Sequence, residues 1–475
     1  QAQEVLSLHF SVQIRPQWDK SSGTVSALDL TLKTDRPVKA GEDLAARILT
    51  IVNIPFCPME PASFLDEAGE IPVEARKGGA EMSFIHREFY RSLRDTVGET
   101  VIRYRITPRV QPEGYRSSPY FDLVAEKGGV LGTGTTFLLH PPVLPEETDF
   151  SLRWDLSGLP EGSRGVWSLG TGDCEKRLTV SDILFSAYMA GQVKAIEEGK
   201  AGFYWFGETP FPAEACAGEI TRLFNYMSKL FRDKGGDYRV FTRRNHFPGG
   251  GGTALTRSYI YAYGEGDAVT VEELQSLLAH EMVHNWPTLR DDPPGAGTWY
   301  VEGSAEYYST LIPLEMGICS PERTAAIINE KAGSYYENPM QGLNNLELGK
   351  RYWTDRRCQR LPYARGILYL SNLDAEIRRR TAGQKTLLDI ELALLQLESP
   401  TAEDFLRVGS EIAGFDLRPG YEDMCAGKLP PPDPDAFGGK FRVVPCKVKL
   451  NNAQHRADRE LLDEESDGYR WEVKE

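Results

Sequence analysis

Two histidines one helical turn apart constrain this chain more than any other feature of its sequence. His280 and His284 are four residues apart, and Glu281 follows the first of them. In an α-helix, with about 3.6 residues per turn, side chains at this spacing lie on one face and can bind the same ion. Glu281 would lie beside that ion, where its carboxylate can take a proton from an activated water. The pattern therefore predicts a helix that carries a zinc site, with His280 and His284 as ligands and Glu281 as the general base.

The residues around this motif also favour a helix. Thr270 and Glu273 have the spacing of a capping box, and Pro287 is expected to end the helix. Apolar residues recur between them at helical intervals, at Leu274, Leu277, Leu278 and Val283. Two histidines on such a helix could instead lie in the protein core with their hydrogen bonds satisfied there. Glu281 and the acidic residues downstream favour the metal site.

A catalytic zinc ion usually has three protein ligands and a water, so the two histidines need one more ligand. Glu302 and Glu306 lie in the segment that follows, four residues apart and therefore on one face of a predicted helix. We predict that Glu302 completes the site for one Zn²⁺ ion and that Glu306 orients one of the histidines from behind. Two alternatives remain for Glu306, which could itself be the ligand or an ordinary exposed charge on a helix.

The zinc helix and the glutamate segment together resemble those of the gluzincin metallopeptidases. In that group a second helix carries a Trp-x-x-Glu-Gly ligand segment, which Trp299 to Gly303 matches, and Trp286 matches a His-x-Trp extension of the zinc helix. His284 and Glu302 are separated by 17 residues, one fewer than in the better-known aminopeptidases of the group. The resemblance implies a zinc-dependent peptidase in which Glu302 is the third ligand.

A tyrosine further along the chain matches another segment of this group. Tyr363 and Gly366 have the Tyr-x-x-Gly spacing of the family's catalytic tyrosine segment. The resemblance implies that the Tyr363 hydroxyl donates a hydrogen bond to the oxyanion of the tetrahedral intermediate. Without the resemblance, Tyr363 would more simply be a packing tyrosine, one of 21 in the chain. The apolar spacing from Ile367 to Arg378 predicts an amphipathic helix that follows Tyr363.

A run of four glycines that ends at Gly252 precedes the zinc helix. Aromatic and small residues then alternate up to Tyr263, as in a half-buried strand, and glycines beside a strand let another backbone approach closely. In gluzincin aminopeptidases this position pairs with the substrate backbone, so the resemblance implies that Gly251, Gly252, Thr253 and Ala254 contact substrate. Ala254 stands where a glutamate of that group binds the free amino terminus, so endopeptidase action remains an alternative. The glycine run could also be a flexible turn.

Across roughly residues 180 to 440 the chain is similar to the glycyl aminopeptidase family of gluzincins, including the stretches 378–388 and 413–416. Many members carry a PDZ module after the peptidase domain, and we expect none here because the remaining tail is short and polar. The resemblance implies a thermolysin-like zinc catalytic domain with a helical C-terminal lobe. It also implies a peptide substrate, hydrolysed by a metal-activated water.

The composition is that of an ordinary globular protein. Of 475 residues, 41% are hydrophobic and 26% are charged, which is enough to bury two or three cores. The formal net charge of −15 would repel phosphate backbones and argues against nucleic acid as a partner. Because no apolar run reaches 18 residues, we expect no membrane span.

The pattern of strands and helices predicts a multidomain α+β protein. Residues 5–14 and 29–32 alternate at the period of a strand, and Gly and Pro breaks follow, which favours a β-sandwich-like N-terminal domain over residues 1–180. Helical signals begin near Thr179 and dominate after Thr270. We therefore predict an α/β catalytic subdomain over residues 181–325 and a helical C-terminal subdomain with a tail over residues 326–475.

Seven cysteines without a Cys-x-x-Cys pair are too sparse for a disulfide scaffold. Cys425 and Cys446 could bridge the tail, and buried free thiols are an equal alternative. The chain begins at Gln1 without an apolar leader, which suits a processed secreted or periplasmic protein, with a cytoplasmic location as the alternative.

The sequence thus predicts a hydrolase, a zinc metallopeptidase of the HExxH type acting as an aminopeptidase. Three alternatives remain: an endopeptidase, another kind of zinc hydrolase, and a binding protein that keeps zinc as a structural relic. The intact Glu281 argues against the last, because a binding protein needs no general base.

Overall fold

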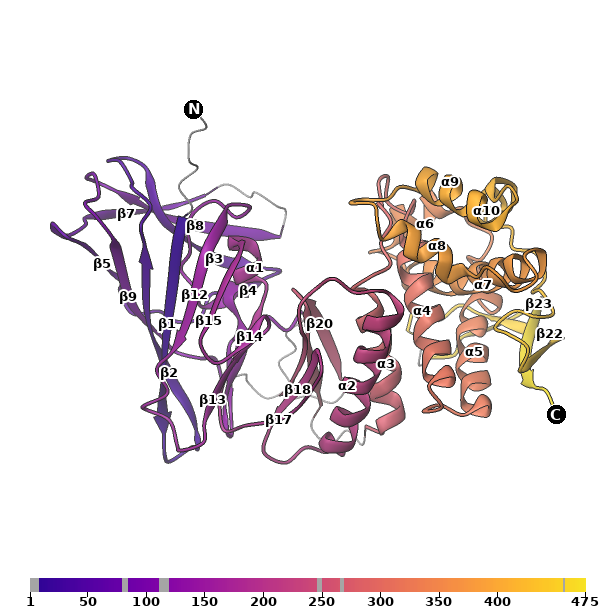
Figure 1. The fold of residues 1–475 in the computed structure, drawn as a ribbon, viewed down its shortest axis with the longest axis horizontal. Coiled ribbons are helices and arrows are strands. Elements are labelled where there is room, and N and C mark those ends of the chain that lie inside the picture. Colours follow the sequence, from indigo (N-terminus) through magenta and orange to yellow (C-terminus); the bar gives the residue numbers. More distant parts are fainter. Residues whose placement is uncertain (1–7, 79–83, 111–118, 246–249, 265–268, 456–457) are drawn as a thin grey trace. The chain divides into compact units, whose positions relative to one another are not determined.

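The computed structural model describes residues 8–78, 84–110, 119–245, 250–264, 269–455 and 458–475, and these form a mixed α+β protein (Figure 1). Contacts divide the chain into two compact units. The first unit comprises Gln1–Arg222 and Gly235–Val271, and the second comprises Leu223–Lys234 and Glu272–Glu475. The predicted α+β class is confirmed, whereas the division into parts at residues 180 and 325 stays a prediction.

The first unit begins with two sheets whose strands pair mostly antiparallel. The two sheets share one hydrophobic core. The seven-stranded sheet has the order β15-β12-β1-β2-β9-β5-β6. Its strands are β1 (Leu8–Asp19), β2 (Thr24–Thr34), β5 (Ser63–Asp66), β6 (Gly69–Glu70), β9 (Thr100–Ile106), β12 (Glu147–Trp154) and β15 (Cys174–Thr179). The four-stranded sheet has the order β4-β3-β8-β7, with β3 (Asp43–Ile51), β4 (Ile54–Pro55), β7 (Val73–Lys77) and β8 (Ile85–Ser92).

Alternation along the strands explains this packing. Along β1, Phe10, Val12 and Ile14 are buried, while the residues between them are more exposed. They belong to one core cluster with Ile48 and Ile85 of the four-stranded sheet, as in a sandwich. The predicted strands at residues 8–14 and 29–32 are confirmed, and residues 5–7 lie outside the described part of the chain.

Two further five-stranded sheets complete the first unit. One has the order β10-β11-β16-β13-β14, and the other has the order β17-β18-β19-β21-β20. Their strands are β10 (Val124–Glu126), β11 (Gly129–Thr133), β13 (Arg164–Trp167), β14 (Gly170–Thr171), β16 (Ala187–Gly191), β17 (Val193–Glu198), β18 (Ala201–Phe206), β19 (Tyr238–Arg244), β20 (Gly251–Leu255) and β21 (Ser258–Tyr263). Two short helices, η1 (Gly134–Thr136) and α1 (Val180–Leu184), lie between strands, and α2 (Ala213–Leu230) runs from the first unit into residues of the second.

Strand β21 differs from its prediction. It is buried along its whole length rather than half-buried. It lies between β19 and the edge strand β20, so its backbone is paired on both sides. Ile260 belongs to a core cluster, and the ring of Phe211 contacts Tyr261 and Tyr263, so apolar groups cover the tyrosines that alternation alone would leave in water.

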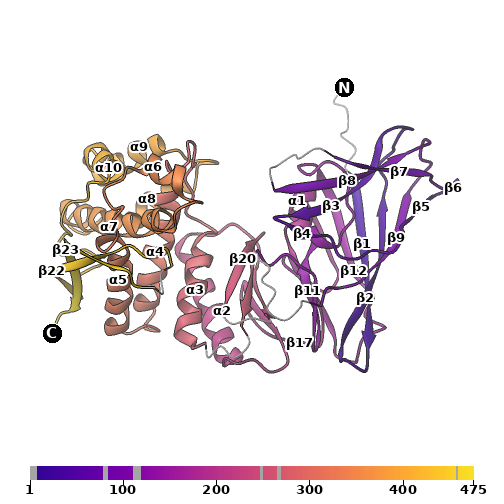
Figure 2. The same cartoon turned by 180° about the vertical axis from the view of Figure 1, so that it is seen from behind.

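The second unit is mainly helical. Its helices are α3 (Val271–Val283), which begins at the unit boundary, α4 (Thr298–Glu315), α5 (Pro321–Tyr336), α6 (Asn345–Arg351), α7 (Arg356–Arg380), α8 (Leu387–Leu394), α9 (Ala402–Ala413) and α10 (Arg418–Cys425). Figures 1 and 2 show α4 and α5 side by side, with α7 crossing them. Among the described helices, none has the length and apolar character needed to cross a membrane.

Two features of the second unit depart from the predictions. Tyr363 does not precede its helix but lies inside α7, which begins at Arg356 because the Asp355 side chain accepts a hydrogen bond from the backbone N–H of Arg357. The tail forms a hairpin of β22 (Phe441–Asn451) and β23 (Leu461–Val473), a sheet that the sequence did not reveal because its strands are rich in charged residues.

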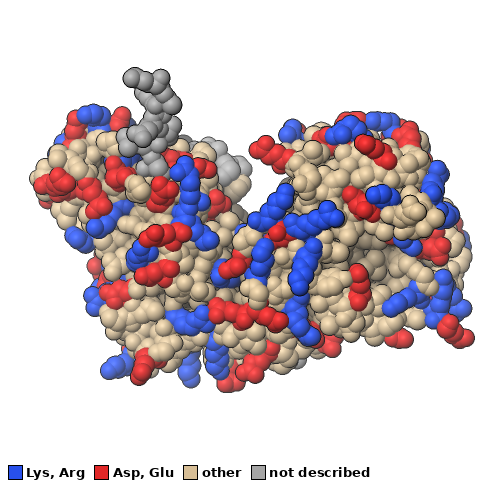
Figure 3. All heavy atoms as spheres, in the orientation of Figure 1, with Lys and Arg blue, Asp and Glu red and all other residues tan. Residues whose placement is uncertain are grey.

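All seven cysteines are free in the structure. Acidic and basic side chains are interspersed over the face drawn in Figure 3.

Candidate metal centre

The zinc helix α3 is held by its apolar face and by the residues that follow it. Leu278 and Met282 are fully buried, which fixes the opposite face that carries His280. After the helix ends, Trp286 stacks on Phe231, with ring centroids 4.9 Å apart. Its indole N–H donates to Asp233, at 3.1 Å. These contacts fix the end of the helix at Val283 and therefore the position of His284, which directly follows it.

One carboxylate fixes the start of helix α4, which carries Glu302 and Glu306. Oδ1 of Asp291 accepts hydrogen bonds from the backbone N–H groups of Gly295, Gly297 and Thr298, at 2.9, 2.8 and 2.9 Å. N–H groups at a helix start have no partner within the helix, so a carboxylate here both satisfies them and complements the helix dipole. Asp291 therefore fixes where α4 begins, one turn before Glu302.

The glycines of two motifs lie against each other where α4 crosses α7. A Cβ added to Gly303 would lie 2.5 Å from the Cα of Gly366, and one added to Gly366 would lie 2.1 Å from the Trp299 carbonyl oxygen. Any side chain at either position would therefore push the helices apart. This close approach places Glu302 of α4 near Tyr363 of α7, and it gives both motif glycines a structural reason.

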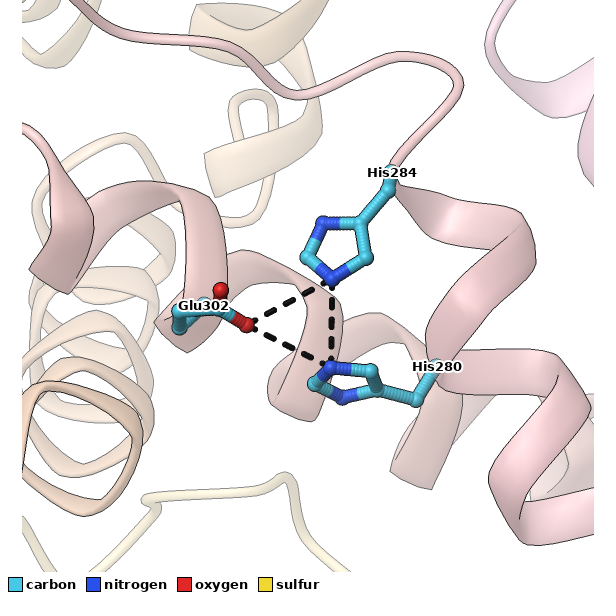
Figure 4. A group of neighbouring side chains, drawn as sticks. All are labelled: His280, His284 and Glu302. Carbon is cyan, nitrogen blue, oxygen red and sulfur yellow. Dashed lines mark hydrogen bonds and ion pairs between the residues drawn. The ribbon is translucent and has the colours of Figure 1, made fainter. Parts of the chain in front are cut away.

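His280, His284 and Glu302 point toward one another (Figure 4). The Nε2 atoms of the two histidines are 3.2 Å apart, and each lies 3.4 Å from Oε2 of Glu302. Ligand atoms about 2.0–2.1 Å from a tetrahedral zinc ion lie about 3.3–3.4 Å from one another. The donor set and its spacing therefore fit one zinc ion, with a fourth position left for water.

The polar contacts of these side chains also indicate a cation between the ligand atoms. Nδ1 of His280 lies 2.8 Å from Oε1 of Glu306, which favours the proton on Nδ1 and leaves the Nε2 lone pair facing His284 and Glu302. Oε2 of Glu302 is buried and makes no hydrogen bond within the described part of the chain. Lone pairs that face one another in a buried site repel unless a positive charge lies between them.

Lys331 of α5 compensates the charge of Glu306. Its ammonium lies 2.7 Å from Oε2 of Glu306 and donates to the backbone oxygen of the same residue, at 3.3 Å. Glu306 thus lies between His280 and Lys331, and its predicted role of orienting a metal ligand from behind stays a prediction. The alternative reading of Glu306 as an exposed helix charge does not fit this environment, because its side chain is only 16% exposed.

The pKa values follow from these neighbours. Burial disfavours the charged form of His280, but Glu302 and Glu306 outweigh it and raise its pKa to about 9. Burial likewise opposes ionisation of Glu302, yet His280 and His284 lower its pKa to about 2. For Glu306, burial is the largest single effect and opposes ionisation, but Lys331 and His280 together outweigh it and hold the pKa below its usual value. In the absence of a metal ion, Lys331 and a proton on His280 thus compensate the two buried carboxylates, and a cation bound by His280 and Glu302 would replace that proton.

Glu281 and Tyr363 line a pocket of about 870 Å³ together with His280 and Glu306. This volume is within the range of ligand pockets. Burial raises the pKa of Glu281 against the opposing effect of the two histidines, which makes its carboxylate a better proton acceptor. Burial, followed by the charge of Glu302, raises the pKa of Tyr363, which therefore stays protonated as a hydrogen-bond donor. The Tyr363 ring stacks on His280, with centroids 5.9 Å apart.

Glu306 of α4, Gln454 and His455 line part of the pocket, and faces of three further helices form its other walls. They contribute Glu273, Ser276, Leu277, His280 and Glu281 from α3, Arg323, Ile327, Glu330, Lys331 and Ser334 from α5, and Arg356, Gln359, Arg360, Tyr363 and Ala364 from α7. Such spacing of three, four and seven residues marks one face of each helix. The pocket is therefore built mainly from helices, with polar side chains on each wall.

The predicted substrate-binding residues Gly251, Gly252, Thr253 and Ala254 lie in the other unit. They form the edge strand β20, with one side of its backbone unpaired within the described sheet. A Cβ on Gly252 would lie 2.2 Å from the Tyr259 ring, so this glycine is required by local packing. Their role at the site stays a prediction, and residues 246–249 of the same run lie outside the described part.

Sequence reasoning missed Asp291 and Lys331. Neither lies in a recognisable motif, and Lys331 reaches Glu306 across 25 residues of chain. The signal for Asp291 was present, because an aspartate shortly before a predicted helix is a capping candidate.

No family model and no curated protein matches this chain. Its fold is similar to that of an aminopeptidase N family protein from Idiomarina loihiensis, with a TM-score of 0.68 and 13% identity over 94% of this chain and 80% of that one. It is also similar to an M1 zinc metallopeptidase from Deinococcus radiodurans, with a TM-score of 0.50 and 17% identity over 91% of this chain and 97% of that one. A variant of that metallopeptidase with a bound Tyr-Ser-Ala substrate matches with a TM-score of 0.51, 15% identity, and coverage of 90% and 96%. The chain therefore has the fold of these M1 proteins.

Proposed function

We propose that this protein is a zinc-dependent metallopeptidase of the glycyl aminopeptidase type, which removes residues from the amino terminus of peptides. The observation that carries the proposal is the triangle of His280, His284 and Glu302 ligand atoms, with sides of 3.2–3.4 Å, beside a pocket lined by Glu281 and Tyr363. The shared fold supports it, since the neighbours include a zinc metallopeptidase with a bound peptide.

His280, His284 and Glu302 would hold the ion, and Glu306 would hold His280 in the orientation that binds it. When bound, zinc would polarise the scissile carbonyl and lower the pKa of water toward about 7. The buried Glu302 carboxylate and the two neutral imidazoles suit this ion, because the set is of mixed nitrogen and oxygen donors with one net negative charge.

Each remaining residue has one task in the hydrolysis. Glu281 takes the proton of the attacking water and delivers it to the nitrogen of the leaving amine as the carbon–nitrogen bond breaks. Tyr363 donates a hydrogen bond to the oxygen that becomes negative in the tetrahedral intermediate. Both groups line the pocket, so they face the space in which a peptide would lie.

Endopeptidase action is the second candidate, and Ala254 is the observation that favours it. A free amino terminus needs an acidic partner, and the edge strand β20 carries none among Gly251 to Leu255. An aminopeptidase would then bind the amine through an acid elsewhere in its pocket.

A library of peptides, each paired with its N-acetylated form, separates the two candidates. The zinc-loaded protein is incubated with both sets, with and without a chelator, and products are identified by mass spectrometry. Stepwise loss of residues from free amino termini alone supports the aminopeptidase. Chelator-sensitive internal cuts in both sets support the endopeptidase, and no cleavage by a protein with bound zinc contradicts the proposed function.

A further inference from the structure

A second tyrosine hydroxyl lies beside that of Tyr363. Tyr352 directly follows helix α6, and its hydroxyl oxygen lies 3.3 Å from the hydroxyl oxygen of Tyr363. Tyr363 lines the pocket, whereas Tyr352 is not among the described residues that line it. Tyr352 is therefore placed to act on Tyr363 rather than on a substrate.

A buried arginine fixes the segment that leads into α6 and Tyr352 against α7, the helix that carries Tyr363. Arg365 lies on α7 two residues after Tyr363 and is fully buried. Its guanidinium donates to Oδ1 of Asn345, the first residue of α6, at 2.6 Å. It also donates to the backbone oxygens of Gln341 and Leu343, at 2.8 and 2.7 Å. Charge-assisted bonds of this kind fix the segment before α6 against α7.

Close backbone packing holds the other side of α6. A Cβ on Gly349 would lie 2.2 Å from the Pro294 carbonyl oxygen, and one on Gly295 would lie 2.1 Å from the Asn345 carbonyl oxygen. Helix α6 is thus packed on the turn where Asp291 caps α4. The position of Tyr352 is therefore tied to α4 and α7, which carry Glu302 and Tyr363 of the proposed site.

The chemistry of the pair depends on which hydroxyl donates. A tyrosine hydroxyl has one proton and can also accept hydrogen bonds, so only one of the two can donate across the pair. If Tyr363 donated to Tyr352, its proton would be used there. If Tyr352 donates to Tyr363, the Tyr363 proton is free to point into the pocket, and the bond that it accepts makes it a stronger donor.

We propose that Tyr352 is a positioning residue, whose hydroxyl donates to the Tyr363 oxygen and directs the Tyr363 proton toward the substrate oxygen. The inference rests on the proposed function and adds a residue to it. A purely structural role for Tyr352 is the alternative, because its ring also packs on Trp353, with centroids 5.0 Å apart.

Tyrosine-to-phenylalanine variants separate the two roles. Tyr352→Phe keeps the ring and removes the hydroxyl, and it should lower kcat about fivefold, which corresponds to about 1 kcal/mol, with KM unchanged. Tyr363→Phe should lower kcat about a hundredfold. The double variant should be no slower than Tyr363→Phe alone, because Tyr352 acts only through that hydroxyl.

Zinc content and unfolding midpoint are measured on every variant, and Tyr336→Phe serves as the control because its ring packs on Tyr469 of the hairpin instead. Rate losses that multiply in the double variant, or a Tyr352→Phe effect on KM or zinc content with kcat unchanged, would overturn the inference alone. An inactive wild-type protein with bound zinc would overturn the proposed function and this role with it.

Discussion

Replacing Glu391 by glutamine should stabilise the protein at alkaline pH far more than in acid. Glu391 of α8 is 1% exposed, and one of its oxygens accepts a hydrogen bond from the Tyr300 hydroxyl of α4. Its other oxygen is buried and has no hydrogen-bond partner within the described residues. Burial raises the pKa of Glu391 from 4.5 to about 7, and the bond from Tyr300 offsets this only in part.

The direction in which stability changes with pH follows from proton binding to Glu391. Between these two pKa values the folded protein holds a proton that the unfolded chain has released, so rising pH favours unfolding. The stability linked to Glu391 is complete below pH 4.5 and is lost as the pH rises through about 7. The shift corresponds to about 3 kcal/mol in total, of which about 2.5 kcal/mol is lost between pH 5 and pH 8.5.

Urea unfolding of the zinc-free wild type and Glu391→Gln at pH 5 and pH 8.5 measures this loss. The difference in free energy of unfolding between the two proteins should move in favour of the variant by about 2.5 kcal/mol from the lower to the higher pH. Any effect of the glutamine amide on the free energy of unfolding that is the same at both pH values cancels in this comparison. Glu398→Gln, at an exposed position after the same helix, should show no such change. A pH-independent difference for Glu391→Gln would refute the reasoning.

Three further substitutions test the site and its support. His284→Ala should reduce bound zinc from one ion per chain to about none by metal analysis after dialysis, while His9→Ala in the first unit keeps it; full zinc in the first variant would contradict the ligand assignment. Glu306→Gln should weaken zinc binding about tenfold in competition with a chelator, because the amide holds His280 less strongly, and unchanged affinity would exclude that role. Gly366→Ala should cost about 1–3 kcal/mol in urea unfolding and lower kcat, because its Cβ would meet the Trp299 oxygen at 2.1 Å. Gly420→Ala, with open space around it, is the matched control, and equal stability of both glycine variants would argue against the helix-crossing explanation.

Local patterns in the sequence predicted the parts of the site that a single helix positions. The spacing of His280, Glu281 and His284 depends only on helical geometry, and α3 holds the first two while His284 directly follows its last residue. Glu302 and Glu306 share a face of α4 for the same reason. The helix that holds Tyr363 was placed too late, because its apolar spacing was followed only from Ile367, whereas the Asp355 cap starts the helix at Arg356.

Contacts between distant segments could not be predicted in this way. The pairing of Gly303 with Gly366 joins residues of two helices, and nothing in either motif shows that the glycines meet. Lys331 and Tyr352 act through partners on other helices, and each looks like an ordinary surface residue in the sequence. The burial of Tyr261 depends on Phe211, which lies before a different helix.

The most direct test of the proposed chemistry compares the wild type with Glu281→Gln, each loaded with one zinc ion per chain. Glutamine keeps the shape of the side chain but cannot take a proton from water, so cleavage of the best peptide from the library should fall at least a thousandfold, on the order of the losses known for essential general bases. The zinc content should stay at one ion in both proteins. Wild-type turnover in the zinc-loaded Glu281→Gln variant would contradict the account.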